Sequence, residues 1–517
     1  EKDIALIRNL GANAVQFAFH PPHPFLLDLC DQYGLLAFEE IPFYEIPSDI
    51  FSTENYQTLT GNYTKEMIRR DKNHPSVIAW GFGDGFESID PRAKTLLDQL
   101  QSVEKSMDNR LTYYVSLSLD DTQNSSIVDI AGVRLENLDI KGFTASLLRW
   151  KQSHPDQPVI VGRYGKAVET GNRNGYSDPM SQEAQARYLF QRYDVIKAAD
   201  IAGSFLWSFE DWRGDRPVLS IQSETPDLYA QGIVEYNREK KVAYDVVRSM
   251  FLGEKIAALP IGTHSVSPPV SYVLLGLLLL ILFFWLLNTD RRFRESVFRA
   301  LRRPYNFFAD IRDQRILSNL HTAILSAIVA VTFAIVVSSI VYHFRSSMLL
   351  DYMITMIITS DSLKRAVIKL VWHPVECIAY GSLACFAWMF FVTVLVELFS
   401  FFVRTKVYLF HSYSVAVWST LPMVIFIPLG MILYRVMESE IYVIPVLVIF
   451  GIVMIWILFR TLKGISIIYD ISSVKIYAIG IIVLAGIGIL WYGYFDYAHS
   501  MMAYIHFMMS TVVPAAN

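Results

Sequence analysis

The side chains of this sequence that could do chemistry are carboxyl groups that stand where apolar, strand-like segments end. Glu40 lies near the end of one such segment at residues 35–41, and Asp84 and Glu87 follow another at residues 77–82. Two facing carboxyl groups can divide proton transfer and nucleophilic attack between them. Two further carboxylates after a third segment are Glu210 and Asp211. We treat all of them as candidate acid–base or nucleophilic groups.

The first half of the chain alternates strand-like and helix-like segments, and this pattern would bring those carboxylates together. The strand-like segments are residues 12–19, 35–41, 77–82, 111–115, 127–133, 158–164 and 201–209. The accompanying helix-like segments are residues 2–10, 25–33, 56–70, 92–107, 143–152 and 181–199. Continuous apolar strands separated by amphipathic helices predict a parallel sheet covered by helices. Seven such units in about 250 residues favour a (β/α) barrel over an open sheet.

Composition excludes several classes of function. Hydrophobic residues make up 53% of the 517 residues and charged residues only 18%, which is low for a soluble protein. The formal net charge of −4, with no basic face in the first half, argues against binding to nucleic acid. The cysteines Cys30, Cys377 and Cys385 give neither a disulfide within the first half nor a zinc-type spacing. We expect no metal and no cofactor.

The second half contains six apolar runs whose length approaches that of a membrane span. They are residues 270–287, 323–342, 375–402, 415–434, 441–459 and 476–492. A single run could be a buried helix of a soluble domain, but six in series predict an all-α bundle of transmembrane helices. Pro422 and Pro428 predict a kink in the fourth run. The chain then divides into a barrel, a linker, a first span, a basic segment and a five-helix domain, at residues 1–255, 256–269, 270–287, 288–322 and 323–517.

Lysine and arginine in the loops predict the orientation of these spans. The segment after the first span holds Arg291, Arg292, Arg294, Arg299, Arg302, Arg303, Arg312 and Arg315. Cytoplasmic loops carry such an excess, so we place this segment in the cytoplasm and, with six spans, the barrel and the C-terminus outside it. Later loops on the same side carry Arg404, Lys406, Arg460, Lys463 and Lys475. The opposing loop carries Arg345, Lys364, Arg365 and Lys369, which weakens the bias without reversing it.

Short motifs run through the first half in a fixed order. They lie at residues 3–16, 19–21, 28–36, 39–42, 70–80, 203–209 and 232–238, with Lys241 after the last. The ordered set resembles the barrel domain of glycoside hydrolase family 2, the group of β-galactosidases and β-glucuronidases. The resemblance implies that a first barrel strand, and usually two β-sandwich domains, precede residue 1. Seven strands alone would expose sheet edges, so we expect the full-length protein to supply the missing strand.

The resemblance also locates the family's two catalytic carboxylates. Its acid/base stands in a Trp-x-x-Gly-Asn-Glu motif, which here reads Trp80-Gly-Phe-Gly-Asp84-Gly85. Its nucleophile stands in a Pro-Val-Ile-x-x-Glu-Tyr-Gly motif, which here reads Pro158-Val-Ile-Val-Gly-Arg163-Tyr-Gly. A glycine cannot transfer a proton, and an arginine stays protonated and cannot be an anionic nucleophile. The retaining mechanism, which needs two carboxyl groups about 5–5.5 Å apart, is therefore closed.

Asp84 and Glu87 are the nearest substitutes for the lost acid/base, and they could equally be solvated loop carboxylates. A third reading pairs Asp84 with Arg163 across the old cleft, because the pair would neutralise both charges. In that case Arg163→Ala should destabilise the domain. The cleft itself could still bind a ligand, since aromatic faces suit the C–H groups of a sugar ring. By the resemblance, the ligand-binding residues would be His20, Glu40, Trp80, Asp84, Arg163, Trp207 and Trp212.

The second half resembles the Yip family of multi-span membrane proteins, at residues 303–308 and 413–422 and in its five spans after the basic segment. That resemblance implies a scaffold or trafficking role more than transport. The leading hypothesis is a membrane-anchored pseudo-glycosidase, whose barrel binds a β-linked glycan or a protein partner without hydrolysing it. One alternative is an active retaining β-glycosidase, β-galactosidase-like or β-glucuronidase-like, that uses displaced carboxylates. The other is a transporter with an accessory sugar-receptor domain. The expected partners are the lipid bilayer and the ligand, with no nucleic acid.

Overall fold

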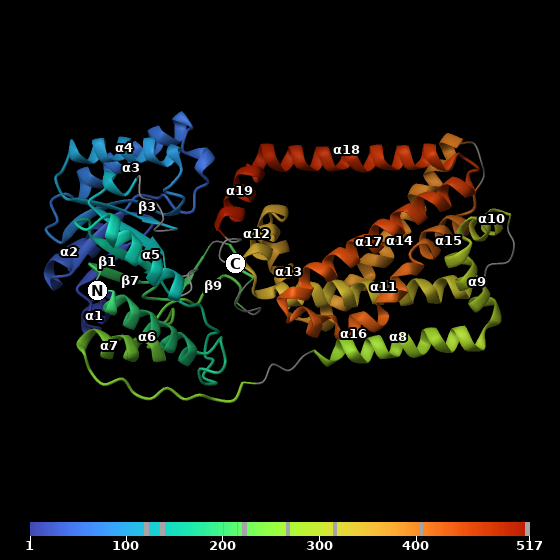
Figure 1. The fold of residues 1–517 in the computed structure, drawn as a ribbon, viewed down its shortest axis with the longest axis horizontal. Helices are drawn as coiled ribbons and strands as arrows, with labels where there is room; N and C mark the ends of the chain where they lie inside the picture. Colours follow the sequence, from blue (N-terminus) through green and yellow to red (C-terminus); the bar gives the residue numbers. More distant parts are fainter. Residues whose placement is uncertain are drawn as a thin grey trace. The chain divides into compact units, whose positions relative to one another are not determined.

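The computed structural model describes the chain except residues 118–123, 135–139, 200, 215, 220–224, 265–268, 314–317, 404–406 and 512–517. Arg315, Arg404 and Lys406 of the predicted basic loops lie outside the described residues. The chain forms two compact units, one of Glu1–Ser265 with Ala498–Asn517 and one of Val266–Tyr497. The first unit contains the sheet and the second is helical (Figure 1).

The first unit is built on seven parallel strands in sequence order, which confirms the predicted parallel, barrel-like sheet. The strands are β1 (Ala14–Phe17), β2 (Leu36–Glu40), β3 (Val77–Phe86), β4 (Leu111–Ser116), β5 (Ile130–Arg134), β6 (Val159–Tyr164) and β7 (Gly203–Leu206). A short antiparallel pair, β8 (Trp212–Arg213) and β9 (Leu228–Tyr229), follows β7. Because all neighbouring strands of the seven-stranded sheet are parallel, their carboxyl ends lie at one edge of the sheet, here called the mouth.

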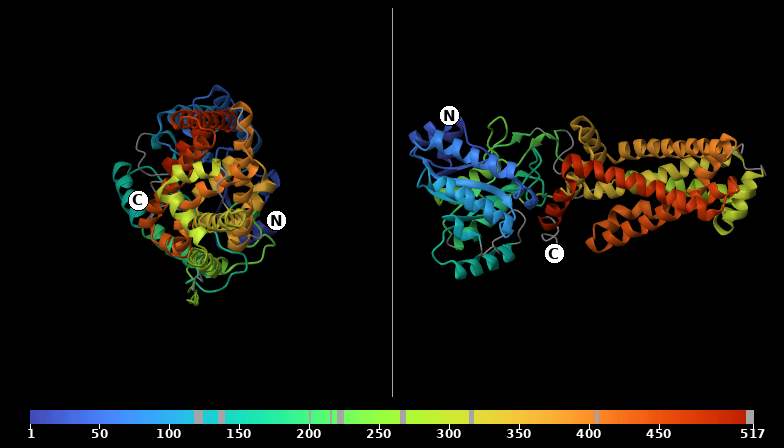
Figure 2. Two further views of the ribbon diagram at one scale, coloured as in Figure 1. Left: turned by 90° about the vertical axis from the view of Figure 1, so that its right-hand side faces the viewer. Right: turned by 90° about the horizontal axis from the view of Figure 1, so that it is seen from above.

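Helices cover the outside of the curved sheet (Figure 2). They are α1 (Lys2–Asn9), α2 (Pro24–Tyr33), α3 (Glu54–Asp71), α4 (Pro91–Lys105), α5 (Ile140–Ser153), α6 (Gln182–Ala198) and α7 (Val242–Leu252). Their starts are fixed by local chemistry. Asp90 accepts a hydrogen bond from the Arg92 N–H ahead of Pro91, and Ser181 accepts one from the Ala184 N–H. Such caps satisfy N–H groups that have no partner within the helix.

Alternation along the strands divides the sheet into two faces. One face encloses the barrel interior, with the buried Phe38, Ala79, Tyr113, Val115, Ile130 and Ile160. The other face packs on the helices; Trp80 and Phe82 belong to the cluster that includes Leu96 and Leu97 of α4. Side chains alternate between the faces of a strand, so Ala79 and Trp80 point to opposite sides.

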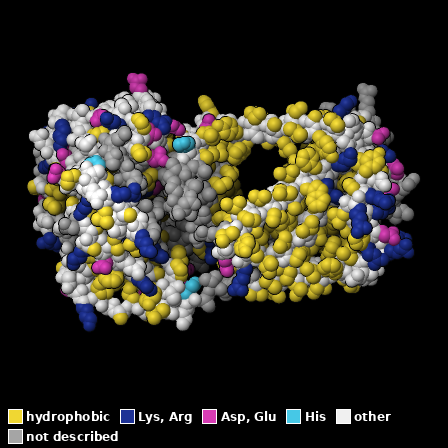
Figure 3. All heavy atoms as spheres, in the orientation of Figure 1, with side chains coloured by type: hydrophobic (Ala, Val, Ile, Leu, Met, Phe, Trp, Pro, Cys, Tyr) yellow, Lys and Arg dark blue, Asp and Glu magenta, His cyan; other side chains and the backbone are white. Residues whose placement is uncertain are grey.

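The second unit contains six helical segments that are long and apolar enough to cross a membrane. They are α8 (Val270–Thr289), α11 (Asn319–His343) with η3 (Phe344–Ser346), α14 (Pro374–Val403), α15 (Leu409–Ser419) to α16 (Phe426–Met437), α17 (Glu440–Ile468) and α18 (Ser473–His499). Four shorter helices complete the described second half: α9 (Arg291–Arg302), α10 (Pro304–Arg312), α12 (Met348–Ile357) and α13 (Asp361–Trp372). Hydrophobic side chains cover the visible face of this unit (Figure 3), as the predicted transmembrane bundle requires.

Packing within the second unit is uneven. In the fourth segment the 3-10 turn η4 (Leu421–Ile425), with Pro422 in its first turn, separates α15 from α16, so the helix is broken where a kink was predicted. The apolar windows of the second and fourth segments are each 61% buried, whereas those of α17 and α18 are each 6% buried. The last helix of the chain, α19 (Met501–Thr511), follows α18 and belongs to the first unit.

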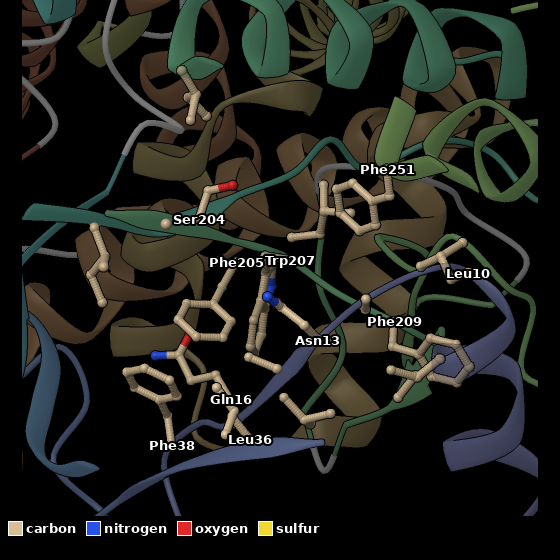
Figure 4. A pocket seen from close by; sticks show the side chains of 18 of the residues that line it. Leu10, Asn13, Gln16, Leu36, Phe38, Ser204, Phe205, Trp207, Phe209 and Phe251 are labelled. Carbon is tan, nitrogen blue, oxygen red and sulfur yellow. The ribbon is translucent and has the colours of Figure 1, made fainter. Parts of the chain in front are cut away.

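A cavity of 770 Å³ opens between β1 and β7, the first and last strands of the sheet. Its lining includes Asn13 and Gln16 on the β1 side and Ser204 and Phe205 on the β7 side (Figure 4). Phe38 of the barrel interior also reaches it. The sheet of the described residues is therefore a near-barrel that stays open along one side.

Candidate functional site

The mouth of the near-barrel gathers charged side chains from four strands. Glu40 ends β2, Asp84 lies near the end of β3, and Arg134 and Arg163 lie in β5 and β6. All four are buried, with exposed fractions of at most 7%. Buried charges are stable only when paired and hydrogen-bonded, so their partners decide what this site can do.

The segment after β2 supplies two of those partners. The Phe43 C=O accepts a hydrogen bond from the Asp84 N–H at 2.9 Å, and the Glu45 N–H donates to the Asp84 C=O at 3.1 Å. This pairing holds Tyr44 and Glu45 against the end of β3. Phe43 stacks on Phe86 of β3 with ring centroids 4.9 Å apart, which also holds the segment after β2 against β3.

Arg134 connects the two sides of the mouth. Its Nε donates to Asp84 Oδ1 at 2.6 Å, and its Nη1 donates to Glu45 Oε1 at 2.7 Å. Charge-assisted hydrogen bonds of this length are among the stronger polar contacts in proteins. Burial alone would raise the pKa of Glu45, but the Arg134 guanidinium beside it lowers that pKa below its usual value.

Gly85 makes room for the Arg134 guanidinium. A Cβ atom at position 85 would collide with Arg134 Nη2 and Cζ, and the backbone there has φ +74°, a conformation that favours glycine. The pairing of β3 with β4 shifts register on both sides of Asp84. At the position expected to carry the acid/base, the space that a side chain would fill is therefore occupied by the Arg134 guanidinium.

Arg163 is enclosed by aromatic rings. Its Cζ atom lies 4.1 Å from the ring centroid of Trp207, 5.5 Å from that of Tyr44 and 5.7 Å from that of Phe19. Its Nη1 donates to the Tyr44 hydroxyl at 3.1 Å. A guanidinium is held over aromatic faces by their negative charge density, so this face of Trp207 is already occupied.

The predicted pair of Asp84 and Arg163 exists only as a long contact. Arg163 Nη1 lies 3.9 Å from Asp84 Oδ2, whereas Arg134 approaches the same carboxylate to 2.6 Å. Asp84 thus lies between two guanidinium groups, and Arg134 is its closer partner.

Glu40 is a second buried carboxyl at the mouth. It accepts hydrogen bonds from Gln16 Nε2 at 2.6 Å and from the Phe19 N–H at 3.0 Å. Burial raises its pKa to about 7, and the nearby charge of Asp84 adds to the increase. A carboxyl group near neutral pKa is a possible proton donor, but this one is fully covered by protein.

The other predicted site residues are distributed more widely. The ring centroids of Trp207 and Trp212 lie 5.3 Å apart. Trp212 stacks on Tyr229 with ring centroids 5.1 Å apart, and all three side chains are half-buried. The Ser48 hydroxyl donates to Glu87 Oε2 at 3.5 Å. His20 is exposed.

Trp80 and the Glu210–Asp211 pair lie apart from the charged cluster. The Trp80 indole N–H donates to Asp108 at 3.2 Å on the helix-covered side of the sheet, so the structure does not bring Trp80 into the site. Glu210 forms an ion pair with Arg238 at 2.5 Å. Asp211 forms a buried pair with Lys241 at 2.7 Å.

Among the described residues, the metal-like grouping lies at the other end of the strands. Asp28, Asp31 and His74 place one ligand atom each within 4.8 Å of the others. Asp31 also accepts hydrogen bonds from the Ser76 N–H at 2.8 Å and contacts His74 Nδ1 at 2.8 Å. These contacts account for the grouping without an ion.

Sequence reasoning missed four residues of the site: Phe19, Tyr44, Glu45 and Arg134. Arg134 directly follows the apolar segment 127–133, so its place at a strand end was visible in the sequence. Tyr44 and Glu45 follow Glu40 by four and five residues, but nothing in the pattern says that their loop folds back over β3.

Parallel strands in sequence order, outer helices and polar side chains gathered at the carboxyl ends of the strands define a (β/α)-barrel-like domain. Residues 1–254 match the model described as glycosyl hydrolases family 2, TIM barrel domain. The first half of the chain is therefore a barrel domain of that family.

Several curated relatives of this chain are β-glucuronidases. The enzyme of Sus scrofa is 27% identical over 271 residues, which cover 48% of this chain and 40% of the relative. That of Streptococcus agalactiae is 23% identical over 269 residues, covering 46% and 44%. The chain thus spans less than half the length of these relatives.

Two solved structures are similar to part of the chain. A β-glucuronidase of Bacteroides uniformis has a TM-score of 0.42 at 28% identity, covering 48% of this chain and 32% of the other. A β-galacturonidase of Eisenbergiella tayi has a TM-score of 0.45 at 23% identity, covering 49% and 47%.

Proposed function

We propose that the barrel is a non-hydrolytic member of its family, a pseudo-glycosidase that binds a ligand without cleaving it. One observation carries this proposal: the Arg134 guanidinium packs on Gly85, and Arg163 stands where the nucleophile is expected. A retaining glycosidase needs a carboxylic acid and a carboxylate about 5–5.5 Å apart around the sugar. Here two cations take those positions, and the neighbouring carboxylates Asp84 and Glu45 are bound to Arg134.

The ligand that we propose is a β-linked glycan. Its binding surface would be the half-buried aromatic group of Trp207, Trp212 and Tyr229 beside the mouth. The relatives' names refer to glucuronides and galacturonides, so uronic-acid glycans are the first ligands to test. A protein partner on the same surface is the other outcome.

We further propose that the second unit spans the membrane six times and holds the barrel outside the cytoplasm. Six segments with mean hydropathy between 2.0 and 2.9 support the spans. The arginine-rich segment after α8 supports the orientation, because short cytoplasmic loops are enriched in Lys and Arg. The resemblance of the bundle to the Yip family favours a scaffold over a transporter.

A hydrolysis assay on the purified full chain tests the absence of catalysis. Chromogenic β-glucuronide, β-galacturonide and β-galactoside would be offered between pH 4 and 8, with the Sus scrofa β-glucuronidase as the positive control. We expect no turnover above the uncatalysed rate. Turnover that Asp84→Ala or Glu87→Ala abolishes would overturn the proposal.

A binding assay tests the ligand surface. Titration calorimetry with uronic-acid oligosaccharides should give heat with the wild-type chain and at least tenfold weaker binding with Trp212→Ala, since stacking area is lost. Tyr236→Ala is the matched control, because Tyr236 is 52% exposed and lies outside the aromatic group. Equal affinities of both variants would remove this surface from the proposal.

One observation favours the alternative of a working glycosidase. Burial raises the pKa of Glu40 to about 7, and Glu40 lies near Asp84; a carboxyl group with such a pKa is a possible general acid. Both are buried, so the Tyr44–Glu45 segment would have to move before a sugar could reach them. Measurable hydrolysis that falls at least 100-fold in Glu40→Gln would establish this function.

A further inference from the structure

The helix α9 joins the end of the first long apolar helix to the rest of the second unit. Its sequence places arginine on one side and apolar residues on the other. Phe293, Val297 and Ala300 are buried in the core of the bundle at positions i, i+4 and i+7. This spacing puts them on one helix face, so the opposite face of α9 is turned outward.

Three contacts fix α9 on the bundle. Asp290 caps it by accepting a hydrogen bond from the Phe293 N–H at 2.9 Å, and His321 Nε2 contacts the same carboxylate at 2.9 Å. From α17, Arg460 Nη1 donates to the Ala300 C=O at 3.0 Å. The outward face is therefore presented in one orientation.

The depth of α9 follows from α8. The 20 residues of α8 extend about 30 Å, the thickness of the hydrocarbon layer. Because α9 begins immediately after α8 and turns across the end of the bundle (Figure 1), it lies at the level of the lipid headgroups if α8 spans the membrane. Lys and Arg side chains are visible at this end of the unit (Figure 3).

The outward face carries unpaired positive charge among the described residues. Arg291 pairs with Glu295 at 2.7 Å, and Arg299 pairs with Asp310. Arg292, Arg302 and Arg303 are exposed, and no described acidic side chain lies within ion-pair distance of them. A guanidinium fork matches the oxygens of a phosphate group.

Exposed apolar side chains accompany these arginines on α9 and at the start of α10. Phe298 is 47% exposed, Leu301 38% and Tyr305 56%, and the Arg302 guanidinium lies 5.4 Å from the Phe298 ring. A nucleic acid or an acidic protein would leave part of this apolar surface in water. A membrane surface accepts both kinds of side chain, since apolar groups enter the acyl boundary while arginines meet phosphates.

We propose that α9 and the residue after it, through Arg292, Arg302 and Arg303, bind the phosphate headgroups of anionic lipids. The proposal rests on the proposed membrane insertion of the second unit. Each arginine near an anionic surface contributes roughly a fivefold gain in affinity, so the three together give about 100-fold.

The test uses the full chain in detergent micelles that contain either phosphatidylglycerol or phosphatidylcholine. Retained lipid is measured by native mass spectrometry, and the unfolding midpoint is followed as lipid is added, because a ligand of the folded state raises it. We expect preferential retention of phosphatidylglycerol and a higher midpoint. The variant R292Q/R302Q/R303Q should need roughly 100-fold more phosphatidylglycerol for the same shift.

The matched control is K65Q/R69Q/K72Q, which removes three exposed charges from α3 of the barrel and should behave as wild type. Equal retention of both lipids, or the same affinity in both triple variants, would overturn the proposal. Full displacement of the lipid by inorganic phosphate would show a soluble-anion site instead of a lipid surface. Carbonate extraction of membranes distinguishes a failure of the proposed insertion from a failure of the proposed lipid binding. Extraction of the chain would contradict the insertion. A chain that stays in the membrane but shows no lipid preference would contradict only the lipid binding.

Discussion

At the level of single residues, the site is defined by two arginines with different surroundings. Arg134 is held by carboxylates, Asp84 and Glu45, whereas Arg163 is held mainly by the rings of Trp207, Tyr44 and Phe19 among the described contacts. Removing the partner of a buried charge costs more than removing a cation from aromatic faces, because the remaining charge stays desolvated.

Replacing each arginine should therefore have unequal effects. Arg134→Ala should lower the free energy of unfolding by about 3–5 kcal/mol, and Arg163→Ala by about 1–2 kcal/mol. Urea unfolding followed by near-ultraviolet circular dichroism measures both, with the exposed Arg69→Ala as control. The reverse order would mean that Arg163 is the main partner of Asp84.

The pH dependence of stability should report on Glu40. Its pKa is raised from 4.5 to about 7, so the folded chain binds more protons than the unfolded chain between these values. The stability that Glu40 contributes is fully present below the unfolded pKa and is lost as the pH rises through about 7. Glu45, whose pKa is lowered, contributes stability that is lost toward acid pH.

In the wild type we expect the free energy of unfolding to fall between about pH 4.5 and 7, and Glu40→Gln should abolish this fall. By pH 8 the effect on the free energy of unfolding should be about 1–3 kcal/mol. The acid-side loss linked to Glu45 should remain. Calorimetric unfolding midpoints across pH 4–9 check this. An unchanged profile in the variant would show that Glu40 titrates as an ordinary carboxylate.

At the level of elements, Arg460 donates hydrogen bonds to backbone C=O groups at the ends of two helices. Besides the Ala300 C=O of α9, it donates to the C=O groups of Trp418 and Ser419 at 3.1 and 3.2 Å, where α15 ends. Carbonyls in the last turn of a helix have no partner within it. One guanidinium therefore binds three such groups from two helices, which a lysine cannot do in a fixed fork.

Arg460→Lys should lower the stability of the full chain by about 2–4 kcal/mol, because two buried carbonyls lose their donors. Arg435→Lys, at a side chain that is 70% exposed, should change it by less than about 0.5 kcal/mol. Thermal unfolding in detergent compares the two variants. A loss of similar size in both would indicate a general effect of lysine.

The sequence predicted the elements better than the site. All seven strands overlap the continuous apolar segments predicted to form them, because such segments reflect burial on both faces of a sheet. We predicted that Trp80 lies in the ligand site, but its side chain points toward the helices. Ala79 faces the barrel interior, and neighbouring residues of a strand point to opposite faces. That signal was present in the sequence.

The remaining part of the site depends on geometry that no periodicity encodes. Asp84 meets Arg134 because β3 shifts register at two points around it. Tyr44 and Glu45 reach the mouth because backbone hydrogen bonds fold their loop onto β3. Shifts and loop contacts of this kind follow from tertiary packing and leave no repeat in the chain.

At the level of the whole molecule, the proposed orientation makes a clear prediction. A single cysteine at position 292 should lie in the cytoplasm, and one at position 65 outside it. In a background with Cys377→Ser and Cys385→Ser, and with Cys30 buried, a membrane-impermeable maleimide should label Lys65→Cys in intact cells. Arg292→Cys should react only after permeabilisation, and the opposite result would invert the topology.

The helix α18 makes very few contacts, since only 6% of its apolar window is buried within the protein. If α18 spans the membrane as proposed, it is held by the boundaries between hydrocarbon and water at its two ends and not by close packing on neighbouring helices. An unrelated run of leucine and alanine of equal length should therefore serve in its place. The sequence of α18 should therefore tolerate most apolar substitutions, provided that its length and its mean hydropathy are kept.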